Sequence, residues 1–121
     1  MNLKLLALLL LPFTAQAETI TLDPIGCGNI GLCNDVPNDG GFVIDLTYSA
    51  QYGQVSLTID GVAYYSSPKS YEPWTGLVLT AADGRQAVIT GSFTTTRVYV
   101  SNGRAHYYQT RWYFDGGTVT R

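Results

Sequence analysis

The chain has 121 residues, of which 45% are hydrophobic, 12% aromatic and 13% charged, and its formal net charge is −2. A domain of this size buries roughly two thirds of the surface of its unfolded chain, which leaves too little sequence for a second core. These residues therefore do not hold a multidomain enzyme. The small negative charge argues against a dedicated nucleic-acid-binding protein, which normally carries an excess of lysine and arginine.

Residues 1–17 have the pattern of a cleaved secretory signal. Lys4 gives a positive start, an apolar run extends from Leu5 to Leu11, and Ala15-Gln16-Ala17 supplies the small residues of a cleavage site. No apolar run approaches the ~20 residues that a membrane-spanning helix needs. We therefore expect a single mature domain at residues 18–121 that is periplasmic or secreted and not membrane-spanning.

Charge is divided unevenly along the mature chain. Residues 18–60 contain six carboxylates and no lysine or arginine, whereas residues 61–121 contain six basic residues and three carboxylates. The simplest interpretation is that acidic N-terminal strands pair with basic C-terminal strands in one sheet. The alternative is a polar molecule with one basic face, which would attract an anionic polymer or an acidic partner.

Cys27 and Cys33 are predicted to form a disulfide, because export brings them into an oxidising compartment. The closed ring would restrict Ile30 and Leu32, and an ordered apolar loop loses less entropy when it docks on a partner. Alternatively, the ring only pins the N-terminal segment to the body. We expect no metal site and no cofactor, since the single histidine, His106, is distant and no second cysteine pair is present.

Beyond the signal, apolar residues recur with period two, and Gly, Thr, Tyr and Val dominate, which predicts an all-β domain. The first expected strands are Thr19 to Leu22 and Gly41 to Tyr48. The intervening segment from Asn34 to Gly41 carries several side-chain oxygens that calcium would accept. The same residue types make an ordinary surface loop, and their spacing is not that of an EF-hand.

Asp60-Gly61 predicts the tight turn of a hairpin that joins Val55–Ile59 to Val62–Tyr65. A two-residue type I′ turn would place Ile59 opposite Val62 and Leu57 opposite Tyr64. One face of this hairpin is then apolar.

The segment after this hairpin, residues 66–76, contains two prolines and several serines, which indicate a surface loop. Tyr71 and Trp74 are therefore the aromatic residues expected to be most exposed. The alternative for Trp74 is that it folds back and closes an open end of the core, since a large aromatic side chain is rarely left in water.

Two further hairpins follow. Leu77–Thr80 and Gln86–Thr90 flank a connection that contains Asp83-Gly84. Asn102-Gly103 then predicts a second two-residue turn, with Val100 opposite Ala105 and Tyr99 opposite His106.

Asp115 precedes Gly116-Gly117 and is interpreted as a turn former. Turns at such short spacing, with apolar residues on both faces of several strands, favour a small antiparallel sandwich or a closed barrel built from hairpins.

The aromatic content is the main functional clue. Nine tyrosines and two tryptophans exceed what one small core needs, and these residues present an apolar face and a hydrogen-bonding tip at interfaces. An aromatic run near the end of the chain occupies both faces of one strand and consists of Tyr107, Tyr108, Trp112, Tyr113 and Phe114. Some of these residues are expected in the core, and the others in a stacking strip with Arg104 and Arg111. The candidate partner-binding residues are Ile30, Leu32, Tyr71, Trp74, Tyr108 and Trp112.

No nucleophile motif accompanies His106, and most carboxylates are assigned to turns. The sequence therefore predicts a non-enzymatic exported protein that binds and neutralises another envelope or secreted protein, as inhibitor and immunity proteins do. One alternative is a carbohydrate-binding module that uses exposed tyrosine and tryptophan. Another is a structural subunit of an extracellular assembly, and an enzyme that uses His106 as a general base is a third.

Overall fold

The computed structural model describes residues 17–28, 31–49, 51–67 and 73–121. All regular structure in these ranges is β-strand, as expected. The strands are β1 (Thr19–Leu22), β2 (Ile25–Gly28), β3 (Leu32–Cys33), β4 (Ile44–Ser49), β5 (Gln54–Ile59), β6 (Val62–Ser66), β7 (Trp74–Ala81), β8 (Gln86–Ser101) and β9 (His106–Thr120). Among the described residues, no helix is long and apolar enough to cross a membrane.

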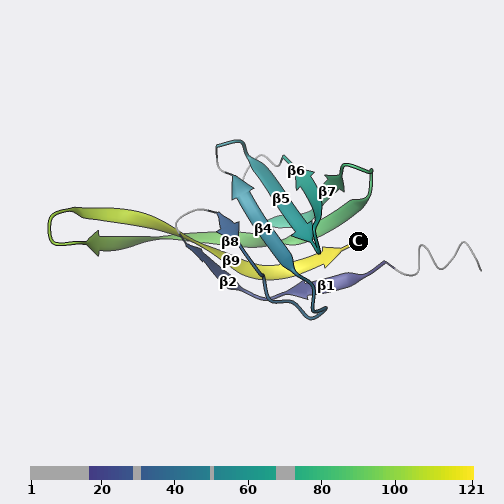
Figure 1. Ribbon diagram of the computed structural model, residues 1–121, viewed down its shortest axis with the longest axis horizontal. Coiled ribbons are helices and arrows are strands. Elements are labelled where there is room, and N and C mark those ends of the chain that lie inside the picture. The colour runs from purple at the N-terminus through teal and green to yellow at the C-terminus, as the bar shows by residue number, and fades with distance from the viewer. Residues whose placement is uncertain (1–16, 29–30, 50, 68–72) are drawn as a thin grey trace, which may run out of the picture.

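The strands form one antiparallel sheet in the order β1-β9-β8-β7-β6-β5-β4-β3, and β2 also pairs with β9. This sheet curls into a half-barrel rather than splitting into two stacked sheets (Figure 1). Of the two expected architectures, the barrel-like one is therefore the closer. The chain is arranged largely as successive hairpins from β4 to β9, because tight turns allow only antiparallel neighbours.

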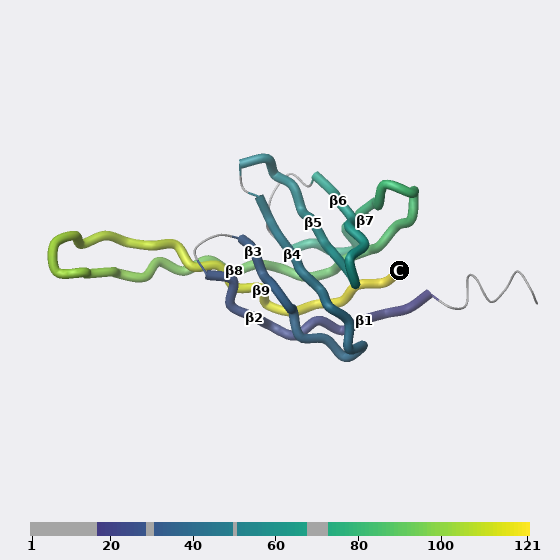
Figure 2. The backbone as a smooth tube through the Cα atoms, in the orientation of Figure 1, coloured from purple at the N-terminus to yellow at the C-terminus, as the bar shows by residue number. Residues whose placement is uncertain are grey.

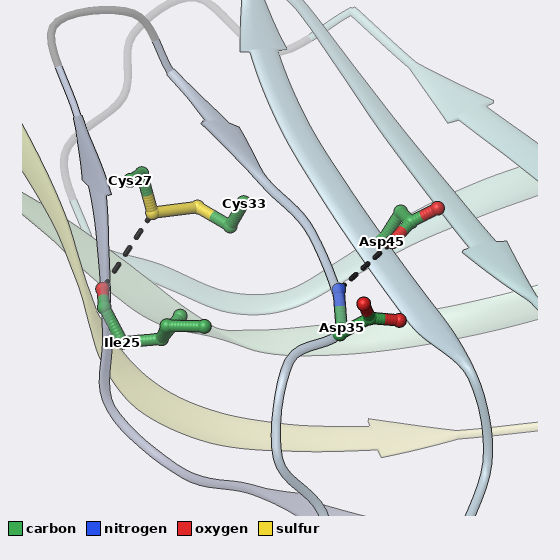
Figure 3. Close-up of a disulfide and its surroundings, with 5 residues drawn as sticks. All are labelled: Ile25, Cys27, Cys33, Asp35 and Asp45. Atoms are coloured by element: carbon green, nitrogen blue, oxygen red, sulfur yellow. Dashed lines mark hydrogen bonds between the residues drawn. A yellow bond between two sulfur atoms is a disulfide. The ribbon is translucent and has the colours of Figure 1, made fainter.

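The two edges of the curled sheet are bridged by the predicted disulfide. Cys27 on β2 and Cys33 on β3 are joined, with their Cα atoms 4.6 Å apart (Figure 3). Further along the same seam, the N–H of Asp23 donates to the carbonyl of Pro37, and the N–H of Asp39 donates to the carbonyl of Thr21. These bonds satisfy backbone groups that an open sheet edge would leave to water.

The core fills the inside of the curl. Strands β4 and β5 bury every second residue, which is the pattern of a sheet with one face covered. Among the most deeply buried side chains are Ile20, Leu22, Val36, Ile44, Leu46, Val55, Leu57, Ile59, Tyr64, Leu79, Ile89, Phe114 and Val119. Leucine, isoleucine and valine thus supply most of these side chains.

The predicted β5–β6 hairpin is confirmed. Ile59 pairs with Val62, and Leu57 pairs with Tyr64. Asp60 and Gly61 both have positive φ angles, 46° and 86°, as a type I′ turn requires. The Asp60 carboxylate also accepts the N–H of Val43 at 2.8 Å, so this turn holds the start of β4.

The predicted β7–β8 hairpin is confirmed as well, with Leu79 opposite Ala87. Its connection is stabilised by Asp83, which accepts the N–H of Arg85 and forms an ion pair of 2.6 Å with the Arg85 guanidinium. The N–H of Arg85, followed by its side chain, lowers the pKa of Asp83.

The predicted register of the β8–β9 hairpin is wrong by two residues. Val100 pairs with Tyr107 and Tyr99 with Tyr108, in place of Ala105 and His106. The reason is the Asn102 side chain, whose Oδ1 accepts the N–H groups of Arg104 and Ala105. Asn102 is therefore the residue before the two central residues of the turn, and its side chain binds the turn backbone. Gly103, with a φ of 90°, is the first central residue.

A bulge divides this long hairpin into two parts. Gly91 pairs with Gly117 and Phe93 with Phe114, so Asp115 and Gly116 together oppose the single residue Ser92. Asp115 therefore lies within a strand, and its assignment to a turn is wrong. Its carboxylate accepts hydrogen bonds from the hydroxyls of Ser92, at 3.0 Å, and Thr94, at 2.7 Å. Gly116 has a φ of 91°, which a bulge of this kind needs.

The bulge directs the hairpin out of the body. Beyond it, residues 94–113 extend as a two-stranded ribbon, which we call the arm (Figure 1). The tube in Figure 2 shows that the arm projects along the longest axis of the molecule. Eight residue pairs build it, from Thr94–Tyr113 to Ser101–His106, which corresponds to about 25 Å at about 3.3 Å per residue.

An aromatic cluster packs where the arm joins the body. Phe93 is at its centre, with ring centroids 5.7 Å from Trp74, 6.0 Å from Trp112 and 5.5 Å from Phe114. Trp74 is only 6% exposed, so the expectation that it lies on the surface is wrong. Its ring also lies 6.3 Å from that of Tyr48, and it fills the core as the alternative interpretation stated.

Replacing Phe93 by alanine is expected to destabilise the fold by about 3–5 kcal/mol, because the cavity would lie at the centre of the cluster. The control is Val78→Ala on the exposed face of β7, which should cost less than about 1 kcal/mol. Urea unfolding of both variants measures the difference. Equal losses in the two variants would contradict a core centred on Phe93.

Removing the disulfide by the double change Cys27→Ser and Cys33→Ser is expected to lower the free energy of unfolding by about 2 kcal/mol, since the closed ring is short. Denaturation of this variant should match that of the reduced wild-type chain. A wild-type chain that is insensitive to reductant would show that the bridge contributes nothing to stability.

Candidate binding arm

The arm gathers exposed aromatic side chains on a ribbon that, beyond its base, pairs with no other described strand. Tyr99, Tyr107, Tyr108 and Tyr113 are all exposed, with Tyr108 at 61%. Side chains alternate between the two faces of the ribbon, and cross-strand partners share a face. Both faces therefore carry tyrosine.

One face, the inner face, continues the buried face of Phe93 and Phe114 outward. From the body to the tip, its residues are Thr95, Arg97, Tyr99 and Ser101 on β8, and Trp112, Thr110, Tyr108 and His106 on β9. The burial decreases along this path. Trp112 is half-buried against the core cluster, whereas Tyr108 and His106 are exposed.

The inner face is ordered by contacts between its own side chains. The Arg97 guanidinium carbon lies 4.6 Å from the centroid of the Tyr108 ring. Tyr108 makes an edge contact with Tyr99 at 5.5 Å, and the Tyr99 hydroxyl shares a hydrogen bond of 2.7 Å with Nδ1 of His106. These contacts form a continuous ladder from arginine to histidine, in which each cation–π or aromatic pair contributes roughly 0.5–1.5 kcal/mol.

The opposite face, the outer face, combines apolar, aromatic and uncharged polar residues with one arginine. It consists of Thr94, Thr96, Val98, Val100, Tyr107, Gln109, Arg111 and Tyr113. Tyr107 and Arg111 are exposed, and Tyr113 packs near Gly26 of β2. The outer face therefore has the composition of an interface rather than that of a wholly solvated surface.

Beyond its base, both edges of the ribbon lack a paired strand in the described residues. β7 pairs with β8 only as far as Gly91, and β2 pairs with β9 no farther toward the tip than Trp112. An isolated two-stranded ribbon is at best marginally stable in water, and open edges readily accept a further strand. The arm therefore has the features of an element that a partner covers.

The disulfide loop ends beside the base of the arm. Gly28, after Cys27, pairs with Trp112, and the carbonyl of Gly31 accepts the N–H of Tyr48. The Tyr48 and Trp112 rings lie 5.8 Å apart. The structure thus places the end of the disulfide loop beside Trp112, the base of the aromatic run that the sequence suggested separately.

The predicted partner-binding residues have different outcomes. Tyr108 is exposed on the arm, Trp112 is half-buried at its base, and Leu32 is 38% exposed beside the disulfide. Trp74 belongs to the core. Ile30 and Tyr71 lie outside the described residues.

Arg97 is the arginine that stacks on Tyr108. The sequence had suggested Arg104 and Arg111 for the stacking strip. Arg97 and Tyr99 are the residues that sequence reasoning left out of the site. Side chains of a strand point alternately to its two faces, and counting back along β8 from the turn places Arg97 and Tyr99 on the same face as Tyr108. This alternation could have identified both residues.

A shallow cleft of about 370 Å³ lies at the base of the arm, on the side of β2. Its lining consists of Pro24, Ile25, Gly26, Thr94, Tyr113, Phe114 and Asp115. It combines one exposed tyrosine with one carboxylate that is held in place by two hydroxyls.

The loop from Asn34 to Gly41 is organised by its own side chains. Oδ1 of Asn38 accepts the N–H groups of Gly40 and Phe42, and its Nδ2 donates to the carbonyls of Val36 and Phe42. Oδ1 of Asp39 accepts the N–H of Thr21. In the parts of the chain that the structure describes, no three His, Cys, Asp or Glu side chains are grouped as metal ligands would be.

The uneven charge is only partly explained by pairing of acidic and basic strands. Glu18 and Arg121 form an ion pair of 3.1 Å between β-strand ends, which is the one such pair between the two halves in the described residues. Arg97, Arg104 and Arg111 instead belong to the arm, which carries no carboxylate.

No protein-family model, curated protein or solved structure matches the chain.

Tyr108→Ser is expected to change the free energy of unfolding of the body by less than about 1 kcal/mol, because the contacts of Tyr108 with Arg97 and Tyr99 order the arm locally and do not reach the core. Trp112→Ser should cost at least about 2 kcal/mol, because that ring packs on the core cluster. Urea unfolding of the two variants tests this boundary between arm and body. A large loss from Tyr108→Ser would mean that the arm is part of the cooperative core.

Proposed function

We propose that this is an exported, non-enzymatic binding protein that captures another envelope or secreted protein through the arm and neutralises it. The observation that carries the proposal is the arm itself, a projecting ribbon with four exposed tyrosines and three arginines. Tyrosine and arginine are enriched among the residues that dominate binding energy at protein interfaces. The signal pattern of residues 1–17 and the disulfide support export.

The order within the arm supports tight binding. The bond between Tyr99 and His106 and the stacking of Arg97 on Tyr108 hold these side chains before a partner arrives. A side chain that is already held loses less entropy on association. The open strand edges offer backbone hydrogen bonds in addition, so a strand of the partner can extend the ribbon.

A projecting ribbon also suits neutralisation. A narrow element of about 25 Å can enter a cleft that a flat surface cannot reach. Its two faces would then contact both walls of the cleft, and both carry tyrosine. Occupation of a substrate cleft would suppress the partner's activity without any chemistry on this chain.

The partner can be identified by a photo-crosslinking residue placed at Tyr108, with Tyr52 as the matched control. Both side chains are well exposed, at 61% and 73%, but Tyr52 lies in the body, in the turn before β5. We expect one stoichiometric protein from the native envelope or secreted fraction to be crosslinked at position 108 and not at position 52. Crosslinking at position 52 alone would contradict binding through the arm.

Substitution of Tyr99, Tyr107 and Tyr108 by serine should weaken the purified complex by at least about thirtyfold, the effect of losing one residue worth about 2 kcal/mol. The control changes Tyr52 and Tyr65 in the body to serine and should leave the dissociation constant unchanged. Calorimetry measures both variants. The partner's activity should fall to zero near one equivalent of the wild-type protein, and full activity of the saturated complex would overturn neutralisation.

A second candidate function, carbohydrate binding, is favoured by the cleft at the base of the arm. Its volume falls within the range of small-ligand sites, about 300–1,000 Å³. The Tyr113 ring can stack on the apolar face of a sugar. The Asp115 carboxylate would accept sugar hydroxyls, as it already accepts those of Ser92 and Thr94.

A glycan array tests this second function. We expect binding that is lost in Tyr113→Ala, retained in Tyr113→Phe, and unchanged in the body variant Tyr65→Ala. The phenylalanine variant keeps the stacking surface and serves as the conservative control. A blank array, or equal binding by Tyr113→Ala, would eliminate the cleft as a sugar site.

A further inference from the structure

The arm and the rest of the domain have opposite charge. The arm contains three arginines and no carboxylate, whereas the remainder of residues 18–121 contains nine carboxylates and three basic residues. Two of those basic residues, Arg85 and Arg121, are already paired with Asp83 and Glu18. The negative excess therefore falls on carboxylates elsewhere in the body.

Five aspartates lie around the segment 35–43, between β3 and β4, and we call this group the acidic end. Its members are Asp23, Asp35, Asp39, Asp45 and Asp60. Oδ1 of Asp45 accepts the N–H of Asp35 at 2.9 Å, as Figure 3 shows. Oδ1 of Asp39 likewise accepts the N–H of Thr21, and Oδ1 of Asp60 accepts the N–H of Val43.

The acidic end is exposed and includes one exposed apolar side chain, that of Val43. All its members except the half-buried Asp45 are exposed, and Val43, beside Asp60, is 58% exposed. The surface thus combines several negative charges with one exposed apolar side chain. The arm offers the complement, arginine together with tyrosine.

The two surfaces belong to different ends of one molecule. The arm projects sideways from the body, whereas the segment between β3 and β4 lies at the lower margin in Figures 1 and 2. An arm cannot fold back onto its own acidic end without leaving the sheet that β8 and β9 share with the body. Within this chain, the surface that complements the arm is therefore the acidic end of a second copy.

We propose that the arm of one copy docks on the acidic end of a second copy, head to tail. The contact uses different surfaces on the two copies, so it leaves one arm and one acidic end available. Repetition produces open chains, or a ring if the rotation closes. The proposal uses the same arm as the proposed function, but it requires no foreign partner.

Sedimentation velocity of the wild-type protein provides the first test. The average mass should rise with protein concentration at about 0.1 M salt and return to that of the monomer at about 1 M, where the screening length falls from about 10 Å to about 3 Å. A monomer at every concentration and salt would overturn the proposal. Association that salt does not weaken would also overturn it.

Two variants test the direction of the contact. The arm variant carries R97Q, R104Q and R111Q, and the acidic-end variant carries D35N, D39N and D60N. Asparagine keeps an oxygen acceptor for the N–H groups of Thr21 and Val43, and it tolerates the positive φ of Asp35 and Asp60. Equal urea midpoints for the variants and the wild type confirm that both fold.

Each variant alone should be monomeric, and their mixture should form a dimer and nothing larger, because one intact arm then meets one intact acidic end. The control R85Q, outside both surfaces, should associate like the wild type. A mixture that stays monomeric would overturn the head-to-tail contact. A monomeric wild type whose arm still binds a foreign acidic protein would overturn self-association and leave the proposed function standing.

Discussion

The pairing of β8 with β9 is the interaction on which both the body and the arm depend. In the body, β9 also pairs with β1 and β2, so the same strand holds the N-terminal segment in the sheet. At the division, Gly117 lies so close to Thr90 that a Cβ atom there would overlap the Thr90 carbonyl. The bulge at Asp115 and Gly116 then turns the hairpin outward. One pair of strands therefore closes the core and, beyond the bulge, builds a ribbon that pairs with β2 at its base and with no described strand farther out.

Local turn chemistry explains how much of this the sequence predicts. The register of β5–β6 follows from Asp60-Gly61, because both residues adopt the positive φ that a type I′ turn demands. The β8–β9 register was missed because Asn102 uses its side chain to bind the backbone and displaces the turn by one position. The error of two residues kept every side chain on its correct face, since strands alternate with period two. The bulge at Asp115 and Gly116 was taken for a turn because both features need a glycine with a positive φ.

The candidate site was harder to predict than the fold, because exposure depends on contacts between distant residues. Nothing near Trp74 in the sequence indicates that Tyr48 and Phe93 receive its ring. Tyr108 and Trp112, four residues apart on one strand, differ because only Trp112 reaches the core cluster. The surplus of aromatic residues was correctly identified as a feature beyond the needs of one core. Many of these aromatic residues lie on a basic ribbon that extends from an acidic body. Only the sheet topology shows this position.

We propose that the arm serves binding and adds little to the stability of the body. A shortened protein tests it most directly, with residues 98–109 replaced by Asn-Gly so that the Arg97–Thr110 pair flanks a tight turn. The decisive measurement is the affinity of this protein for the partner that is crosslinked at Tyr108, made on samples whose urea midpoint equals that of the wild type. We expect an unchanged midpoint and no detectable complex. A shortened protein that folds and still binds with wild-type affinity would contradict it.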